Sequence, residues 1–234
     1  MANHVLLNNV EHRDLKVTSQ FSDEMGDNMM CVPAYPVELR HAQAAYPLLF
    51  TKDNAGNTQL VALLGFEQGE NLFVKEGKWQ ASYRPLLVEK GPFLIGRNEQ
   101  DGKPTLSIHI DLDSPKVSKD EGQPIFLPHG GNTDYIDNMA NILSTIHQSQ
   151  QEVAAYLSML QELDLIESFV VDIELGDEGT HRLAGFSTLN EEKIKALSAA
   201  QLGMLHEKGY LELIYMQLAS MSQLSRLVDL RKAK

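Results

Sequence analysis

One short pattern in the sequence has the residue types of a metal site: His109 and Asp111, with a single residue between them. On a β-strand, residues i and i+2 point to the same face, so both side chains could bind one metal ion. A distant histidine, such as His129 or His181, would complete the two-histidine, one-carboxylate set of Fe(II)-dependent oxygenases. Arg182 could then hold the carboxylate of a cosubstrate. The alternative is that the segment DLDSP ends a strand and begins a turn.

A second set of chemically capable residues lies in the stretch GENLFVKEGKWQASYRP. It supplies an acid, an amide, two aromatic rings and a guanidinium, a mixture that carbohydrate and peptide sites use: Glu70, Asn71, Trp79, Tyr83 and Arg84. In an extended strand Trp79 and Tyr83 share one face. We therefore predict an aromatic platform for ligand binding, with Glu70 and Asn71 projecting from the sheet edge to orient a polar ligand. The alternative is that both rings are core aromatics of a hairpin.

Composition and missing motifs disfavour several classes of function. The chain has 20 basic and 32 acidic residues, a formal net charge of −12, so we expect no nucleic-acid binding. The sequence contains no P-loop, no dinucleotide-binding glycine motif and no hydrolase nucleophile elbow. Cys31 is the only cysteine and has no adjacent histidine, which favours an apolar filler over a catalytic thiol. We therefore expect neither catalysis nor a bound cofactor.

Residues 1–132 have the pattern of an antiparallel β-rich region. The segment YPLLFTKDNAGNTQLVALLGF predicts strand, turn and strand, with the turn at 53–57. Two further hairpins are predicted, one around a tight turn at 76–77 and one in FLIGRNEQDGKPTLSIHIDL. All nine prolines lie between Pro33 and Pro128, which indicates few long helices in this half.

Residues 133–234 have the apolar spacing of helices. From Thr133 to Leu163 apolar residues recur every three or four positions, in one long helix or in two with a break near Gln148. A late hairpin follows, with strands at 169–175 and in HRLAGFSTL, joined by the turn GDEG. Three more helices are predicted, in TLNEEKIKAL, SAAQLGMLHEKG and YLELIYMQLASMSQLSRLVDLR.

Together these elements predict an α+β fold. An antiparallel β-rich N-terminal half (1–132) is expected to pack against a helical C-terminal half (133–234) with a late β-hairpin. The whole chain, 1–234, is expected to form a single domain, a size that can bury a substantial core. The predicted core residues are Leu63, Phe66, Phe73, Trp79, Ile108, Leu143, Leu160, Leu183, Leu211, Ile214 and Leu218.

Several segments occur in an order that is recognisable. They include YPLLFTKD, ALLGFEQGENLFV, IDLDSP, EGQPIF, LAGFSTLNEEKIKAL and HEKGYLELIYMQLASMSQLSRL, and they span the chain from HRDLKV to LSRL. In these segments the chain resembles the SapC family of bacterial proteins. The resemblance implies an association with bacterial surface (S-layer) proteins and with outer-membrane nutrient uptake. It implies no particular reaction, cofactor or catalytic residue.

We therefore expect a non-catalytic binding or accessory protein whose partner is a protein of a surface-layer or outer-membrane nutrient-uptake system. The alternative is an Fe(II)-dependent, cupin-like oxygenase that uses His109, Asp111 and His181. A structural subunit with exposed apolar patches is a third alternative. The sequence predicts no membrane span, and its N-terminus lacks the features of a signal peptide, so we expect a cytoplasmic location.

Overall fold

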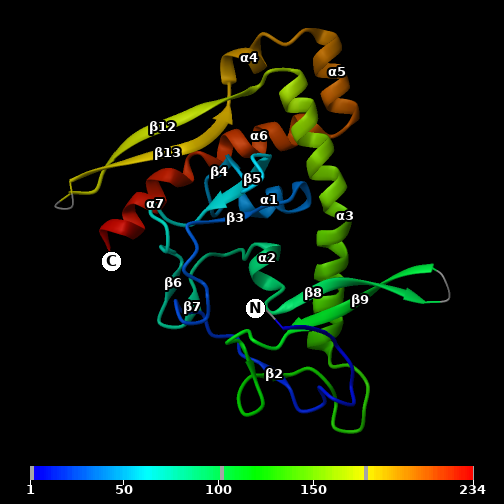
Figure 1. The fold of residues 1–234 in the computed structure, drawn as a ribbon. Coiled ribbons are helices and arrows are strands. Elements are labelled where there is room, and N and C mark those ends of the chain that lie inside the picture. Colours follow the sequence, from blue (N-terminus) through cyan, green and yellow to red (C-terminus); the bar gives the residue numbers. More distant parts are fainter. Residues whose placement is uncertain (1–2, 101–102, 177–178, 234) are drawn as a thin grey trace. The chain divides into compact units, whose positions relative to one another are not determined.

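The structure, a computed structural model, describes residues 3–100, 103–176 and 179–233 (Figure 1). It contains 35% helix and 26% strand, with antiparallel sheets mostly in the N-terminal half and helices in the C-terminal half. These features confirm the predicted α+β fold.

The chain forms two compact units whose segments alternate along the sequence. Unit 1 comprises Met1–Asp27, Val74–Trp79 and Leu86–Gln148, and unit 2 comprises Asn28–Phe73, Gln80–Pro85 and Ser149–Lys234. The unit boundaries do not coincide with the change of sequence pattern at residue 133. The organisation of 1–234 as a single domain stays a prediction.

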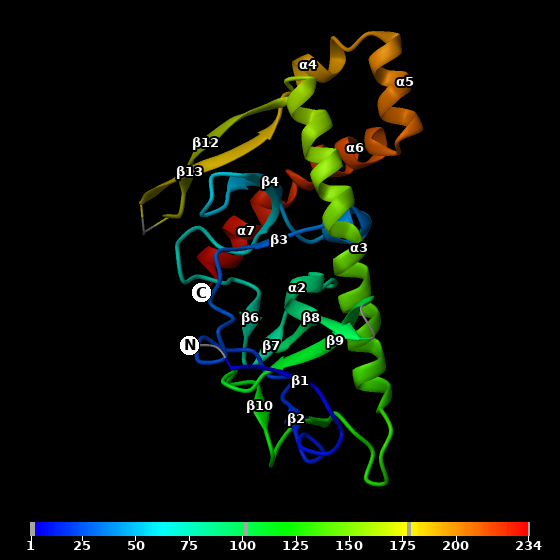
Figure 2. The ribbon, with the colours of Figure 1, turned by 45° about the vertical axis from the view of Figure 1, so that its right-hand side comes forward.

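The described strands of unit 1 form three antiparallel sheets. They are β1 (His4–Leu6), β2 (Lys16–Val17), β6 (Val74–Lys75), β7 (Lys78–Trp79), β8 (Phe93–Gln100), β9 (Lys103–Asp111), β10 (Val117–Ser118) and β11 (Gln123–Pro124). Strand β9 lies between β1 and β8 (Figure 2), and β2 lies between β10 and β11. The predicted turn between β6 and β7 is confirmed, because Glu76 and Gly77 both have positive φ, 52° and 73°, as tight hairpin turns require.

Helix α2 (Leu86–Glu89) and the first part of α3 (Asp134–Glu162) complete unit 1. Helix α3 is continuous, so the one-helix alternative is confirmed. Thr133 caps its N-terminus: its hydroxyl accepts a hydrogen bond from Ile136 N at 3.4 Å and donates to Ile125 O at 2.9 Å. One apolar cluster forms the core of unit 1: Leu15, Val17, Phe93, Ile110, Ile125, Phe126, Ile136, Met139 and Leu143.

Unit 2 is built on an antiparallel sheet with the order β12-β13-β4-β5-β3. Its strands are β3 (Cys31–Pro33), β4 (Leu48–Lys52), β5 (Thr58–Leu63), β12 (Ile166–Glu174) and β13 (Thr180–Leu189). Its helices are η1 (Pro36–Glu38), α1 (Leu39–Ala42), α4 (Glu191–Lys195), α5 (Ala199–Glu207), α6 (Tyr210–Ser220), α7 (Gln223–Lys232) and the remainder of α3. The predicted hairpins β4–β5 and β12–β13 are confirmed. Residues 177 and 178 of the predicted GDEG turn lie outside the described residues.

Two predictions about helices and core are wrong in part. The last predicted helix is two helices, α6 and α7, which break after Ser220. The Ser220 side chain is fully buried and its hydroxyl accepts a hydrogen bond from Leu48 N at 2.9 Å, which fixes the end of α6 to β4. Four predicted core residues are only half-buried, namely Trp79, Ile108, Leu211 and Leu218, whereas the others are buried.

Tyr135, in the first turn of α3, is expected to make the stability of unit 1 depend on pH. Burial, and secondarily the charge of Glu89, raises the pKa of its phenol to about 12. The phenol of the unfolded chain has a pKa of about 10 and loses its proton first. The contribution of the buried, protonated Tyr135 to the free energy of unfolding is therefore complete below pH 10, and it is lost as the pH rises from 10 to about 12. Urea unfolding across this pH range should show a shallower loss of stability for Tyr135→Phe than for the wild type. Parallel profiles of the two proteins would contradict the assignment.

Candidate functional site

The structure places the predicted ligand-binding residues Glu70 and Asn71 in the interior of unit 2. Glu70 is 6% exposed and Asn71 8%, so the prediction that they project from a sheet edge is wrong. Glu70 Oε2 accepts a hydrogen bond from Phe66 N at 2.8 Å, and Oε1 pairs with the Arg231 guanidinium. Asn71 Oδ1 accepts from Phe73 N at 3.0 Å. Both side chains turn inward because the backbone N–H groups of this buried loop need acceptors.

Trp79 and Tyr83 do not share one strand face, which corrects the predicted aromatic platform. Strand β7 ends at Trp79, and residues 81–83 form a bend. Trp79 belongs to unit 1, where its ring meets Phe21 edge-on with centroids 5.6 Å apart. Tyr83 belongs to unit 2, where its carbonyl accepts a hydrogen bond from the Tyr46 hydroxyl. The chain leaves the extended conformation after Trp79. Both rings are half-buried, and ligand binding by them stays a prediction.

Tyr83 takes part in a polar cluster that the sequence did not predict. Its hydroxyl donates to Glu38 Oε2 at 2.9 Å, and Glu38 Oε1 accepts from Tyr35 N at 2.8 Å. Burial, and then the charge of Glu38, raises the pKa of the Tyr35 phenol. His41 stacks on the Tyr83 ring with centroids 5.6 Å apart. Arg84, the remaining predicted residue, is half-buried in the same unit. These contacts hold the start of η1 in place.

The residues of the predicted Fe(II) site are divided between the two units. His109 and Asp111 lie on β9 in unit 1, whereas His181 lies on β13 in unit 2. Asp111 Oδ1 accepts hydrogen bonds from Asn3 N and Asp113 N, each at 3.1 Å. His181 Nε2 lies 2.9 Å from the carbonyl of Phe66.

No group of three or more His, Cys, Asp or Glu side chains that could hold one metal ion occurs within residues 3–100, 103–176 and 179–233. His129 is exposed on a loop, and Arg182 lies 3.8 Å from Asp172. The Fe(II) site therefore stays a prediction that metal analysis can test.

Unit 1 contains a positively lined pocket that sequence analysis did not predict. Its volume is about 450 Å³. The lining combines basic and apolar side chains with one acid: Arg13, Asp14, Leu15, Lys16, Lys119, Pro124, Phe126 and Pro128. We call this the basic pocket.

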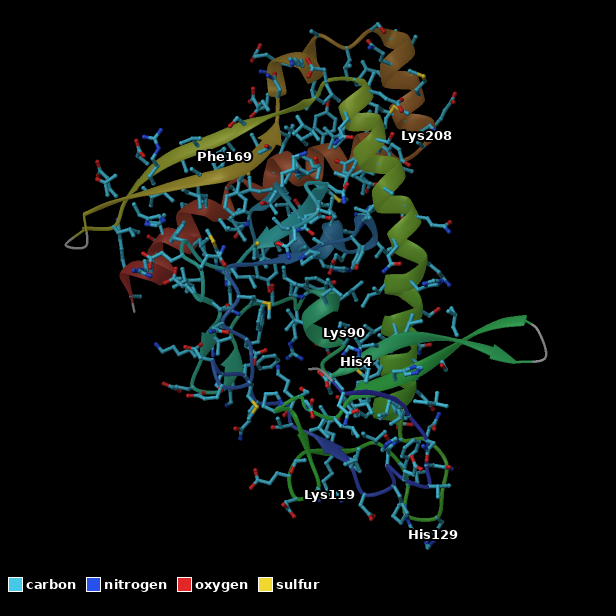
Figure 3. The ribbon with its side chains drawn as sticks, viewed as in Figure 1. His4, Lys90, Lys119, His129, Phe169 and Lys208 are labelled. Carbon is cyan, nitrogen blue, oxygen red and sulfur yellow. The ribbon has the colours of Figure 1, made fainter. Side chains whose placement is uncertain are left out.

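Strand pairing around β2 brings the basic side chains together. Val17 of β2 is buried in the core of unit 1, so its neighbour Lys16 points to the opposite face, as alternation along a strand requires. β10 and β11 flank β2, and Lys119 follows β10 directly. Figure 3 shows Lys119 and His129 on two separate loops. Residues separated by more than 100 positions in sequence therefore line one pocket, and no local periodicity could have indicated it.

The three cations of the basic pocket have no carboxylate partner among the described residues. Lys16 Nζ donates to the carbonyl of Asp120 at 2.8 Å, and an Arg13 Nη donates to the carbonyl of Pro128. Each bond fixes a loop and uses only one of the several N–H groups that these side chains carry. The Lys119 ammonium makes no hydrogen bond or ion pair with any described residue. The pocket thus offers several unused cationic donors, which is the chemistry of an anion site.

Fold and pocket define an α+β protein with a cationic pocket in one of its two units. The chain belongs to the SapC family, whose family model matches residues 7–227 and so spans both units. No curated protein and no solved structure matches the chain significantly. Within the described parts of the chain, no helix is long and apolar enough to cross a membrane.

Proposed function

We propose that the protein is a non-catalytic binding or accessory protein that holds an anionic ligand in the basic pocket. The proposal rests on three cations that have no carboxylate partner in the described part of the chain, although the protein has a net charge of −12. A cleft lined mainly by one sign of charge concentrates ligands of the opposite charge, so this pocket attracts anions although the protein as a whole is acidic. We further propose that it acts in a surface-layer or outer-membrane nutrient-uptake system, with a protein of that system as partner, as the resemblance noted from the sequence implies.

The walls of the pocket indicate what kind of anion it holds. Leu15, Phe126, Pro124 and Pro128 supply apolar surface beside the cations. A volume of about 450 Å³ lies within the usual range of small-molecule sites and is much larger than a simple inorganic anion needs. The ligand is therefore an acid with an apolar body, either a small molecule or a side chain of the partner.

A fluorescent probe with these properties tests the proposal. Anilinonaphthalene sulfonate joins a sulfonate to an aromatic body, whereas phenylnaphthylamine has a similar body and no charge. The folded protein is expected to bind the sulfonate saturably, with one site per chain and an affinity that falls with added salt. The neutral probe should bind at least tenfold more weakly, because only the sulfonate gains charge-assisted hydrogen bonds, each of about 1.5–3 kcal/mol.

Reversing the charge of Lys119 tests whether the sulfonate probe binds in the basic pocket. Lys119 has no side-chain partner among the described residues, so Lys119→Glu should leave the fold intact. It is expected to weaken sulfonate binding about tenfold, because a like charge then faces the anion. Lys208→Glu is the control: it changes net charge equally but lies at the end of α5 in unit 2 (Figure 3), and it should leave affinity unchanged. Equal effects of the two variants would contradict the proposed site.

Metal analysis distinguishes this proposal from the oxygenase alternative. The binding function predicts iron far below one equivalent per chain in protein purified after expression in iron-supplemented medium. Stoichiometric iron that is lost in Asp111→Ala would instead support the Fe(II) site with His109. Loss of stability in that variant is to be measured in parallel, because Asp111 also accepts two backbone hydrogen bonds.

A further inference from the structure

The sheet of unit 2 opens between two of its strands. β4 and β5 pair at five positions, from Leu48↔Ala62 to Lys52↔Thr58, whereas β4 and β13 pair only at Ser187↔Phe50. β13 carries a bulge where the register shifts between Phe169 and Val171 of β12, and Gly185 within it has φ of 87°. A bulge bends its strand. The hairpin β12–β13 extends beyond the other strands of the sheet (Figures 1 and 2).

A small pocket of about 180 Å³ lies at this opening. Four of its lining residues carry hydroxyl or amide groups, and one is charged. The lining consists of Phe50, Thr51, Lys52, Thr58, Gln161, Ile166, Gly185 and Ser187, and all of them belong to unit 2. We call it the hydroxyl pocket. Bulges are over-represented next to active sites, where they redirect a side chain or end strand pairing.

Hydrogen bonding leaves unused donors and acceptors in this pocket. The Thr58 hydroxyl accepts from Lys52 Nζ at 2.7 Å and from Gln161 Nε2 at 3.1 Å, so both of its acceptor positions are occupied. Its own hydrogen has no acceptor among the described residues. The Thr51 hydroxyl donates to the carbonyl of Gly185 at 3.4 Å and keeps its lone pairs free. The half-buried Ser187 hydroxyl makes no hydrogen bond with the described part of the chain.

We propose that the hydroxyl pocket binds a small neutral polyol of monosaccharide size. A sugar hydroxyl is both donor and acceptor. It complements the Thr58 hydrogen, the Thr51 lone pairs and the Ser187 hydroxyl, which the described residues leave available. Lys52 is the only charged group in the lining and is already hydrogen-bonded to Thr58, so the site does not require an anion. The pocket is smaller than the usual drug-sized site, which limits the ligand to a single ring. The inference is independent of the basic pocket, because the two sites share no residue.

Ligand-observed NMR on the full chain tests the inference with glucose, galactose, mannose and N-acetylglucosamine as probes. At least one of them is expected to show saturation transfer and a millimolar dissociation constant. Ser187→Ala should weaken that binding at least fivefold without a change in melting temperature, because the Ser187 side chain makes no hydrogen bond with the described residues. Ser168→Ala is the control, since Ser168 faces Ser187 across the hairpin and does not line the pocket. Absence of saturation transfer from all four sugars, or equal affinity of wild type and Ser187→Ala, would overturn the proposal.

Discussion

Replacing Lys116 by methionine is expected to lower the free energy of unfolding by about 3–5 kcal/mol. Lys116 Nζ lies 2.6 Å from Asp27 Oδ1, and the two side chains are only 11% and 4% exposed. The ammonium also lies 4.4 Å from the centroid of the Phe21 ring. Methionine keeps the apolar stem but removes the charge, so the Asp27 carboxylate loses its lysine partner in the interior of unit 1. The fluorescence of Trp79, whose ring contacts Phe21, reports urea unfolding of this unit.

Two controls separate the buried ion pair from general effects of substitution. Lys119→Met changes an exposed lysine of the same unit and should alter stability by less than about 0.5 kcal/mol. The double variant Asp27→Asn with Lys116→Met should recover much of the loss, because it buries no uncompensated charge. A Lys116→Met protein within about 1 kcal/mol of the wild type would show that the pair is not a main determinant of stability.

Replacing Glu70 by alanine is expected to destabilise unit 2 by about 3–5 kcal/mol. The substitution leaves Phe66 N, in the buried segment of the chain, without its carboxylate acceptor. It also removes the closest ion-pair partner of Arg231, whose side chain is 18% exposed, and leaves Glu67 at 3.6 Å. Far-UV circular dichroism during urea unfolding measures the loss, since Arg231 lies on α7 and most of the described helices belong to unit 2.

Two glutamate variants test which part of the Glu70 side chain matters. Glu70→Gln keeps an acceptor for Phe66 N and removes the charge, so an intermediate loss is expected. Glu67→Gln changes a half-exposed carboxylate and should cost less than about 1 kcal/mol. A Glu70→Ala protein of wild-type stability that has lost binding to a carbohydrate or peptide would restore the ligand-binding role predicted from sequence.

Local patterns were sufficient to predict most elements of the fold. The hairpin β4–β5 follows from two apolar runs around an Asp-Asn-Ala-Gly-Asn turn, and the β6–β7 turn follows from Glu76-Gly77. α3 follows from apolar spacing after a capping threonine. In each case the signal lies within a few residues of the structure that it predicts.

Features that depend on contacts distant in sequence could not be predicted. Glu70 lies in a segment whose residue types are typical of a binding site. In the structure it is buried and forms an ion pair with Arg231, which is more than 150 positions away in sequence. Tyr83 does not continue strand β7, and it is hydrogen-bonded instead to Tyr46 and Glu38 of unit 2, both more than 30 positions away in sequence. The basic pocket forms because β2 pairs with β10 and β11. The local pattern of apolar and polar residues does not indicate which strands pair with each other.

The most direct test of the proposed function is to locate the bound anion on the protein. A titration of ¹⁵N-labelled protein with anilinonaphthalene sulfonate, followed by amide chemical shifts, does so residue by residue. Binding in the basic pocket predicts that the largest shifts occur at the amides that line it: Arg13, Asp14, Leu15, Lys16, Lys119 and Phe126. Shifts that cluster instead between Glu70 and Arg84, with those amides unchanged, would contradict it.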